Sequence, residues 1–265
     1  WLNNNLTYAN AYGFDPGSSS TVTFHGAVDG TMTTAAPQER FCHLRINRPG
    51  GSFSPADSVV VVGNMNLENG NWYSSTAGLT HSFRGNMAIA TNGSWADHTA
   101  NSAVRFDGFA EQTLQDLSTN GYFGNVVVDK NPVDPALPLT PLRLLSRVLS
   151  LGGASLIVEK GFLDLNGNYF RCTGDVTVNN GGLIAIDAGA WLEVGSGRSL
   201  TVNTGTMLSV IGVSGNPARV THHAGNYNFN VESGGTLSAE YATFEYMSAN
   251  GVHVKNGGIL DLGHP

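Results

Sequence analysis

Residues 176–210 read VTVNNGGLIAIDAGAWLEVGSGRSLTVNTGTMLSV, and this stretch holds the pattern that decides the fold. Apolar and polar residues alternate on both sides of Gly181 and again on both sides of Gly205, and the unit recurs around Gly234 and Gly257. These glycines are 24, 29 and 23 residues apart. A unit this short cannot bury its own apolar face, so the repeat predicts coils that stack into a solenoid.

The apolar positions of the repeat align in fixed columns. These columns are Val176, Leu200, Phe229 and Val252; Val178, Val202, Val231 and Val254; Ile184, Leu208, Leu237 and Leu260; and Ile186, Val210, Ala239 and Leu262. Strand centres fall about every eight residues, which gives about three short strands per coil of 23–24 residues. We therefore predict an all-β fold, a right-handed parallel β-helix, with the hand taken from the crossover preference.

The repeat is more degenerate in the first half of the chain. Residues 21–26 match residues 103–108 at an offset of 82. We expect residues 1–20 to form an irregular leader or a partial first coil, and residues 21–265 to form one solenoid with related modules near 21–100 and 103–190. A β-sandwich with two-residue turns such as Asn69-Gly70 is the alternative fold, but fixed columns at a coil spacing are not expected of a sandwich.

Composition narrows the class of protein. Charged residues make up 12% of the chain, about half the usual share of about 25%, and the 34 glycines suit many tight corners. The net charge of -7 disfavours nucleic acid and anionic membranes as partners. Without a run of 18 apolar residues, no membrane-spanning helix is expected.

The chain begins at Trp1, without an initiator Met, and we expect a processed or partial segment of a longer chain. Its two cysteines, Cys42 and Cys172, alternate in step with apolar neighbours and are predicted to lie in the core. A disulfide between them needs neighbouring coils, so the sequence leaves open both their redox state and the compartment.

No metal site or cofactor is predicted. The Gly-Gly pairs are not followed by an Asp at a fixed step, as they would be in calcium-binding solenoids, and no cluster of His, Cys, Asp and Glu has metal-ligand spacing. We interpret these glycines as corners.

The longest coil is the first candidate site. Residues 211–219 interrupt the rhythm, and insertions between coils are where solenoids place binding loops. The segment ends at Arg219, and His222 and His223 follow it, with Tyr227 near them, so this loop is a candidate for ligand contacts. Ordinary surface histidines on a wet loop are the alternative interpretation.

A second candidate is an outward aromatic beside an acid. Trp191 and Glu193 face outward if Leu192 and Val194 face inward. Trp95, in a Gly-Ser-Trp turn, is another candidate for stacking on a sugar. Polysaccharide lyases and hydrolases of this architecture use carboxylates, with Arg or Lys, on one outer face, but no aligned column holds an acid twice.

Several phrases resemble those of a known group. They are Gly-Asn-x-x-Leu at residues 63–67, Gly-Asn-Trp at 70–72, Phe-x-Gly-x-x-x-Gln-Thr-Leu-Gln at 106–115 and Asn-Gly-Gly-x-Leu at 256–260. The chain thereby resembles the large repetitive β-helix proteins that some Gram-negative bacteria export to the cell surface or medium, often with a type-IX-secretion sorting domain. The resemblance implies a bacterial, extracellular or cell-surface location and carries no catalytic residues.

The sequence thus favours an extracellular structural solenoid: a stalk, an adhesin, or a filament or surface-layer subunit. Its partners would be further coils of a longer chain or other copies of itself, with Leu260 and Leu262 at the assembly edge, where unpaired strands are exposed. The alternatives are a carbohydrate-active β-helix enzyme and a glycan-binding module without catalysis.

Overall fold

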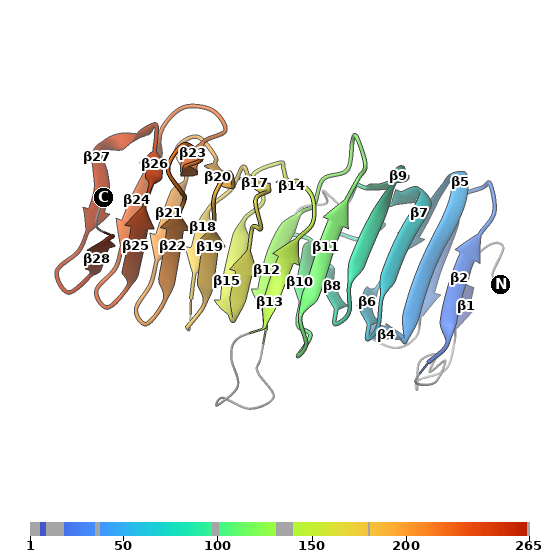
Figure 1. Cartoon of the computed structure of the whole chain (residues 1–265). Helices are drawn as coiled ribbons and strands as arrows, with labels where there is room; N and C mark the ends of the chain where they lie inside the picture. Colours follow the sequence, from blue (N-terminus) through green and yellow to red (C-terminus); the bar gives the residue numbers. More distant parts are fainter. Residues whose placement is uncertain are drawn as a thin grey trace.

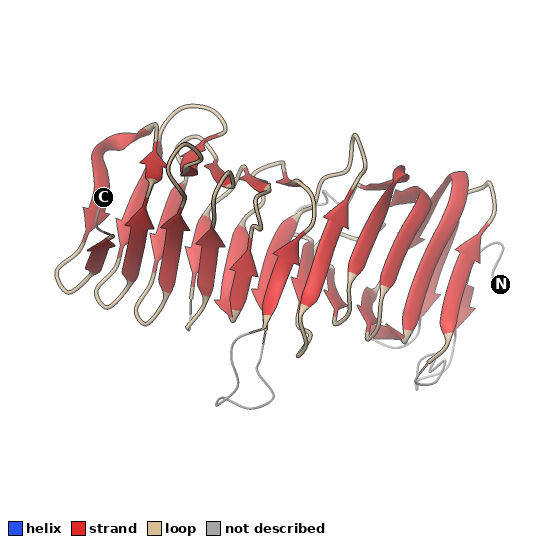
Figure 2. Cartoon of the chain, viewed as in Figure 1, coloured by secondary structure: helices blue, strands red, loops and turns tan. Residues whose placement is uncertain are grey.

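The protein is a rod of stacked coils made of strands (Figures 1 and 2). The computed structural model describes residues 6–8, 19–34, 38–96, 101–130, 140–179 and 181–263. Within these residues there is no helix, and parallel strands stack as a β-solenoid of about 10 turns with coils about 23 residues apart. The all-β solenoid predicted from the sequence is confirmed.

The described strands form three parallel sheets that run along the rod. Sheet A has 13 strands, in the order β1 (Leu6–Tyr8), β3 (Gly30–Thr34), β5 (His43–Pro55), β7 (Met65–Trp72), β9 (Met87–Trp95), β11 (Gln112–Asp116), β13 (Pro141–Leu144), β16 (Phe162–Asp164), β19 (Leu183–Ile186), β22 (Met207–Ile211), β25 (Thr236–Glu240) and β28 (Ile259–Leu262), with β2 (Thr21–His25) paired to β5.

The other two sheets cover the remaining sides. Sheet B has 10 strands: β4 (Gln38–Phe41), β6 (Ser58–Val61), β8 (Thr80–Phe83), β10 (Ala103–Phe106), β12 (Asn125–Asp129), β15 (Leu156–Lys160), β18 (Val176–Val178), β21 (Ser199–Val202), β24 (Tyr227–Val231) and β27 (Met247–Val254). Sheet C has five short strands: β14 (Val148–Ser150), β17 (Tyr169–Cys172), β20 (Trp191–Val194), β23 (Ala218–His222) and β26 (Ala242–Phe244). Among the described residues, only the part of the rod with sheet C shows the expected three strands per coil.

The core is a set of apolar columns that pass from coil to coil. In sheet B one column pairs in register through Phe41, Val61, Phe83, Phe106, Val128, Val158, Val178, Val202, Val231 and Val254. Of these residues only Val254 is not fully buried. The columns predicted around the glycines are confirmed by register, with Ile184 beside Leu208 and Leu208 beside Leu237.

The glycines of the repeat are corners, as predicted. Gly181, Gly205, Gly234 and Gly257 have φ between 70° and 86°, a region that residues with a Cβ rarely adopt. Outward polar side chains bond between the same coils: the amide of Asn203 donates to Asn179 at 2.6 Å, and Lys255 pairs with Glu232 at 2.7 Å. The corners and the side-chain ladder therefore share one coil spacing.

The first coils differ from the prediction of three short strands. Strands β5, β7 and β9 contain 13, 8 and 9 residues and bend around a corner instead of ending there. At that bend Gly70 has φ of 87°, and a Cβ there would lie 2.4 Å from the Arg48 carbonyl oxygen. Because the backbones of neighbouring coils approach so closely at this bend, no loop separates the two sides of the coil. Each of these strands therefore continues from one side of the coil to the next.

Large aromatic side chains fill this first half of the rod. Phe24, Phe53, Trp72, Trp95 and Phe123 form an internal stack with successive centroid distances of 4.5, 5.0, 4.5 and 5.6 Å. All five are buried. A continuous stack of five rings therefore fills the interior of these coils.

Residues that match at the offset of 82 do not occupy equivalent positions in the structure. Residues 21–25 form β2 in sheet A, whereas the matching residues 103–106 form β10 in sheet B. Most of the expected leader, residues 1–20, lies outside the described residues, although Leu6–Tyr8 pairs with β3. The offset of 82 therefore matches strands on different sides of the coil.

Candidate functional site

The candidate site lies on the outer face of sheet C, formed by β17, β20 and β23 (Figure 1). Alternation sets its orientation: Phe170, Leu192 and Val220 are fully buried, so their neighbours point outward. Parallel register then places Tyr169 beside Trp191 and Trp191 beside Arg219, with Arg171 beside Glu193 in the next column. We call Tyr169, Arg171, Trp191, Glu193, Arg219 and His223 the sheet C cluster.

Two aromatic rings form the centre of the cluster. The rings of Tyr169 and Trp191 are 5.1 Å apart between centroids and only 5° from parallel. Because parallel rings in contact are separated by about 3.5 Å, the longer centroid distance means that the rings are offset, as aromatic pairs prefer. Part of each ring is therefore left uncovered by the other, and both residues are partly exposed.

Glu193 is the polar hub beside these rings. Its carboxylate accepts a hydrogen bond from Nε of Arg171 and another, at 3.3 Å, from the indole Nε1 of Trp191. Nδ1 of His223 lies 3.8 Å from the same carboxylate. The hydrogen bond to Glu193 is the main reason that the pKa of Arg171 is raised, and the Arg171 guanidinium also lies 5.9 Å from the Tyr169 ring centroid, within cation–π range.

The structure brings together most of the residues predicted for a site. Trp191 donates a hydrogen bond to Glu193, and His223 lies 3.8 Å from the same carboxylate. Arg219 is the register partner of Trp191 on the next strand. His222 belongs elsewhere, because its ring stacks on Tyr246 at 3.7 Å and its Nδ1 lies 2.7 Å from the Gly225 carbonyl oxygen.

Sequence reasoning missed Tyr169 and Arg171. The signal was present, since each stands 22 residues before its partner, Trp191 or Glu193, close to one coil length. Aligning the coil that contains Trp191 and Glu193 with the preceding coil therefore places Tyr169 and Arg171 at the equivalent outward positions. It was hidden because Tyr169 also matches Trp72 in the longer repeat.

The expectation that Trp95 is a surface aromatic is corrected. Trp95 is fully buried between Trp72 and Phe123 and offers no ring face to an outside sugar. Its strand β9 runs on through the corner, so the Gly-Ser-Trp segment is not a turn, and its alternation places Trp95 inward. Trp72 is buried in the same stack.

The long coil contains the predicted excursion. Val213 and Asn216 pair across a tight antiparallel bridge between β22 and β23, and Val213 is 53% exposed. The excursion leads directly into Arg219 on β23. It therefore borders the sheet C cluster.

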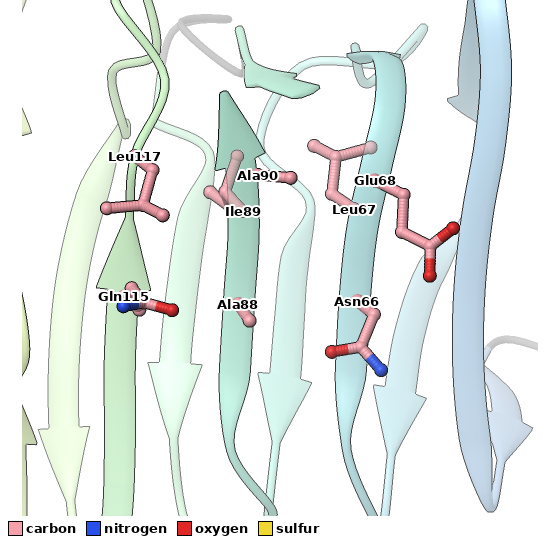
Figure 3. A pocket seen from close by; sticks show the side chains of 8 residues that line it. All are labelled: Asn66, Leu67, Glu68, Ala88, Ile89, Ala90, Gln115 and Leu117. Atoms are coloured by element: carbon pink, nitrogen blue, oxygen red, sulfur yellow. The ribbon is translucent and has the colours of Figure 1, made fainter. Parts of the chain in front are cut away.

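A shallow hollow on the outer face of sheet A is a second, weaker candidate (Figure 3). It is lined by Ala88 and Ala90 of β9, by Asn66 and Glu68 of β7 and by Gln115 of β11, and the alanines have the smallest side chains among them. Glu68 on its rim is paired with Arg45 at 2.7 Å. The hollow has no aromatic lining, so it offers less to a ligand than sheet C does.

The last described coil exposes apolar residues of the inward columns. Leu260 and Leu262 are 46% and 59% exposed, whereas their register partners Leu237 and Ala239 are buried. Strand β28 ends the order of sheet A, and β27 ends that of sheet B. Both residues predicted at the assembly edge thus lie on an open edge of the described rod.

The buried reactive side chains are held in place. Nζ of Lys130 donates to the Ala110 carbonyl and, at 2.9 Å, to Oε1 of Gln112, and burial lowers the pKa of Lys130 to about 8. Cys42 and Cys172 are buried and not joined in a disulfide, and burial raises the pKa of Cys172 to about 12. These groups belong to the interior and not to an accessible site.

The described residues contain no group of three or more His, Cys, Asp and Glu that could hold a metal ion. None of them forms a helix of the length and apolarity that a membrane span requires.

The fold defines the class of protein, a parallel β-solenoid. Comparison of the chain with protein-family models, with curated proteins and with solved structures finds no match.

Proposed function

We propose that this chain is an extracellular structural solenoid, acting as a stalk, adhesin, or filament or surface-layer subunit through coil stacking and surface contacts. One observation carries the proposal: the inward columns are apolar and buried along the rod, yet the column through Leu237 and Leu260 becomes exposed at the last described coil. Exposed strand edges with apolar side chains pair readily with other strands. A further coil of the same pattern fits this edge.

The low content of charged residues and the uncharged amides on the surface support an extracellular location. Only 12% of residues are charged, and the polar ladder between coils includes uncharged amides such as Asn179 and Asn203. The resemblance of several phrases to those of exported bacterial β-helix proteins supports the same location. Antibody labelling of intact producing cells tests this part, and labelling only after lysis would contradict it.

The assembly part is tested by sedimentation of the chain over a range of concentrations. We propose that in solution a second copy of the chain covers the exposed edge at Leu260 and Leu262. The average mass should therefore rise with protein concentration. The double variant Leu260→Asn and Leu262→Asn should stay monomeric. The matched control is Leu117→Asn with Leu145→Asn, because these leucines are 48% and 44% exposed and directly follow β11 and β13, away from the last coil. A monodisperse monomer at every concentration, or equal loss of association in both double variants, would overturn the assembly proposal.

A carbohydrate-active enzyme is the alternative function. The observation that favours it is a carboxylate beside an arginine and aromatic rings on one outer face, namely Glu193 with Arg171 and Trp191. In this structure the carboxylate is already engaged by two donors. Release of reducing or unsaturated sugar from acidic and neutral polysaccharides, abolished by Glu193→Gln, would establish the enzyme, and no release would exclude it for those substrates.

A further inference from the structure

The sheet C cluster carries more charge and more aromatic surface than packing requires. The core beneath it is complete without the outer rings, since Phe170, Leu192 and Val220 are fully buried. Glu193 compensates Arg171. Arg219 is exposed beside Trp191, and among the described residues no ion pair or side-chain hydrogen bond engages its guanidinium. The face therefore holds an uncompensated cation next to an aromatic pair.

A second arginine lies on the other flank of the aromatic pair. Arg147 is exposed and directly precedes Val148, the register partner of Phe170, so it stands one coil before Tyr169. With Arg171 and Arg219 the face carries three arginines against two carboxylates, those of Glu193 and of Glu245, which directly follows β26 beside β23. Arginines therefore outnumber carboxylates on this face, although the charge of Arg147 also acts on the buried Asp116. The whole chain carries -7, so this positive region is local and opposes the general charge of the molecule.

Aromatic faces and free guanidinium groups together suit one chemical class of ligand. Sugar rings present apolar C–H faces that lie against aromatic rings, while guanidinium groups bind carboxylate or sulfate in two-point geometry. A neutral glycan would leave the arginines unused, and an anion without rings would leave Tyr169 and Trp191 unused. The five strands of sheet C stack along the rod, so this face extends over successive coils and can meet a polymer.

We propose that the outer face of sheet C binds an anionic polysaccharide, with a sugar ring against Tyr169 and Trp191 and its carboxylate or sulfate group on Arg219. His223 lies at the edge of the cluster, 3.8 Å from Glu193, and is exposed. Its ring nitrogens can therefore form hydrogen bonds with hydroxyl groups of the bound sugar. The site does not depend on assembly at Leu260 and Leu262, so it can hold or fail independently of the proposed structural role.

The experiment measures retardation of the full chain in native gels that contain one polymer each. Polygalacturonate supplies carboxylates, dextran sulfate supplies sulfates, dextran supplies neutral rings, and polyglutamate supplies charge without rings. We expect retardation by polygalacturonate or dextran sulfate and none by dextran or polyglutamate. The polymer that binds shows whether the site recognises a carboxylate or a sulfate group. In either case, binding should weaken as the salt concentration rises.

Variants separate the roles of charge and ring. Arg219→Ala should raise the dissociation constant about tenfold, which is the loss expected for one charge-assisted contact, and Trp191→Ala should raise it at least as much. The matched controls are Arg40→Ala, an exposed arginine on sheet B, and Phe109→Ala, an aromatic that is 53% exposed on a turn. Both controls should bind as the parent chain does.

The proposal fails on any of four results. These are no retardation by either anionic sugar polymer, equal retardation by dextran, equal retardation by polyglutamate, or equal losses in Arg219→Ala and Arg40→Ala. If circular dichroism shows that Trp191→Ala is misfolded, Trp191→Phe replaces it, and retained binding by that variant with loss in Arg219→Ala still supports the site.

Discussion

Trp95 offers the sharpest test of how the first half of the rod is held together. We consider the change Trp95→Ala. The indole is fully buried, stacks on Trp72 at 4.5 Å with 12° between the planes, and meets Phe83 edge-on at 5.8 Å. The substitution therefore opens a cavity in the middle of the aromatic stack.

The expected loss follows from two opposing effects. Truncating a buried Trp to Ala costs about 3–5 kcal/mol in protein cores. The indole Nε1 of Trp95 has no hydrogen-bond partner among the described residues, and leaving a buried donor unpaired costs about 1–3 kcal/mol, which the substitution removes. Taking the middle of each range, we expect a net loss of about 2 kcal/mol. Trp95→Phe, which keeps a ring and removes the N–H, should cost less than half as much.

Native-state hydrogen exchange is the appropriate assay, because coils contact only their neighbours and the loss should be local. Amides of β6, β8 and β10 should exchange faster in Trp95→Ala, while amides of β21 and β24 should be unchanged. The control Phe109→Ala should change neither group. A loss below about 1 kcal/mol, or equal acceleration along the rod, would refute the reasoning.

Three further outcomes are expected. Burial lowers the pKa of Lys130 to about 8, so between pH 8 and about 10 the unfolded chain binds a proton that the folded chain lacks. The stability of the parent chain relative to Lys130→Met should rise there by at most about 1.4 kcal/mol per pH unit in urea titrations, and a flat difference would contradict this. Burial raises the pKa of Cys172 to about 12, so its contribution to stability is lost as pH rises above about 9. Iodoacetamide at pH 8 should leave this thiol unmodified in the folded chain, and rapid alkylation would be inconsistent with it. Glu193→Gln removes the pair with Arg171, whose side chains are 13% and 29% exposed; we expect a loss of about 1 kcal/mol that shrinks in 1 M salt, and a salt-independent loss would argue against an electrostatic origin.

Parts of the site could be predicted because they depend on strand alternation. Trp191 and Glu193 point outward because Leu192 and Val194 are buried, and this follows from period two alone. Trp95 was misplaced because a local Gly-Ser-Trp cue suggested a turn. A better signal was its distance from Trp72, one coil earlier, since both rings lie in register in β7 and β9.

Alternation and left-handed glycine corners are local features, and their repetition forces each coil to cover the next, so a β-solenoid can be predicted from the residues alone. Which outward side chains meet depends instead on how the coils are aligned in space. Coil lengths vary, with 22 residues from Tyr169 to Trp191 and 28 from Trp191 to Arg219. Register between coils is fixed by hydrogen bonds between strands that lie a whole coil apart in sequence. The sheet C cluster exists because those varied steps nevertheless place its residues side by side.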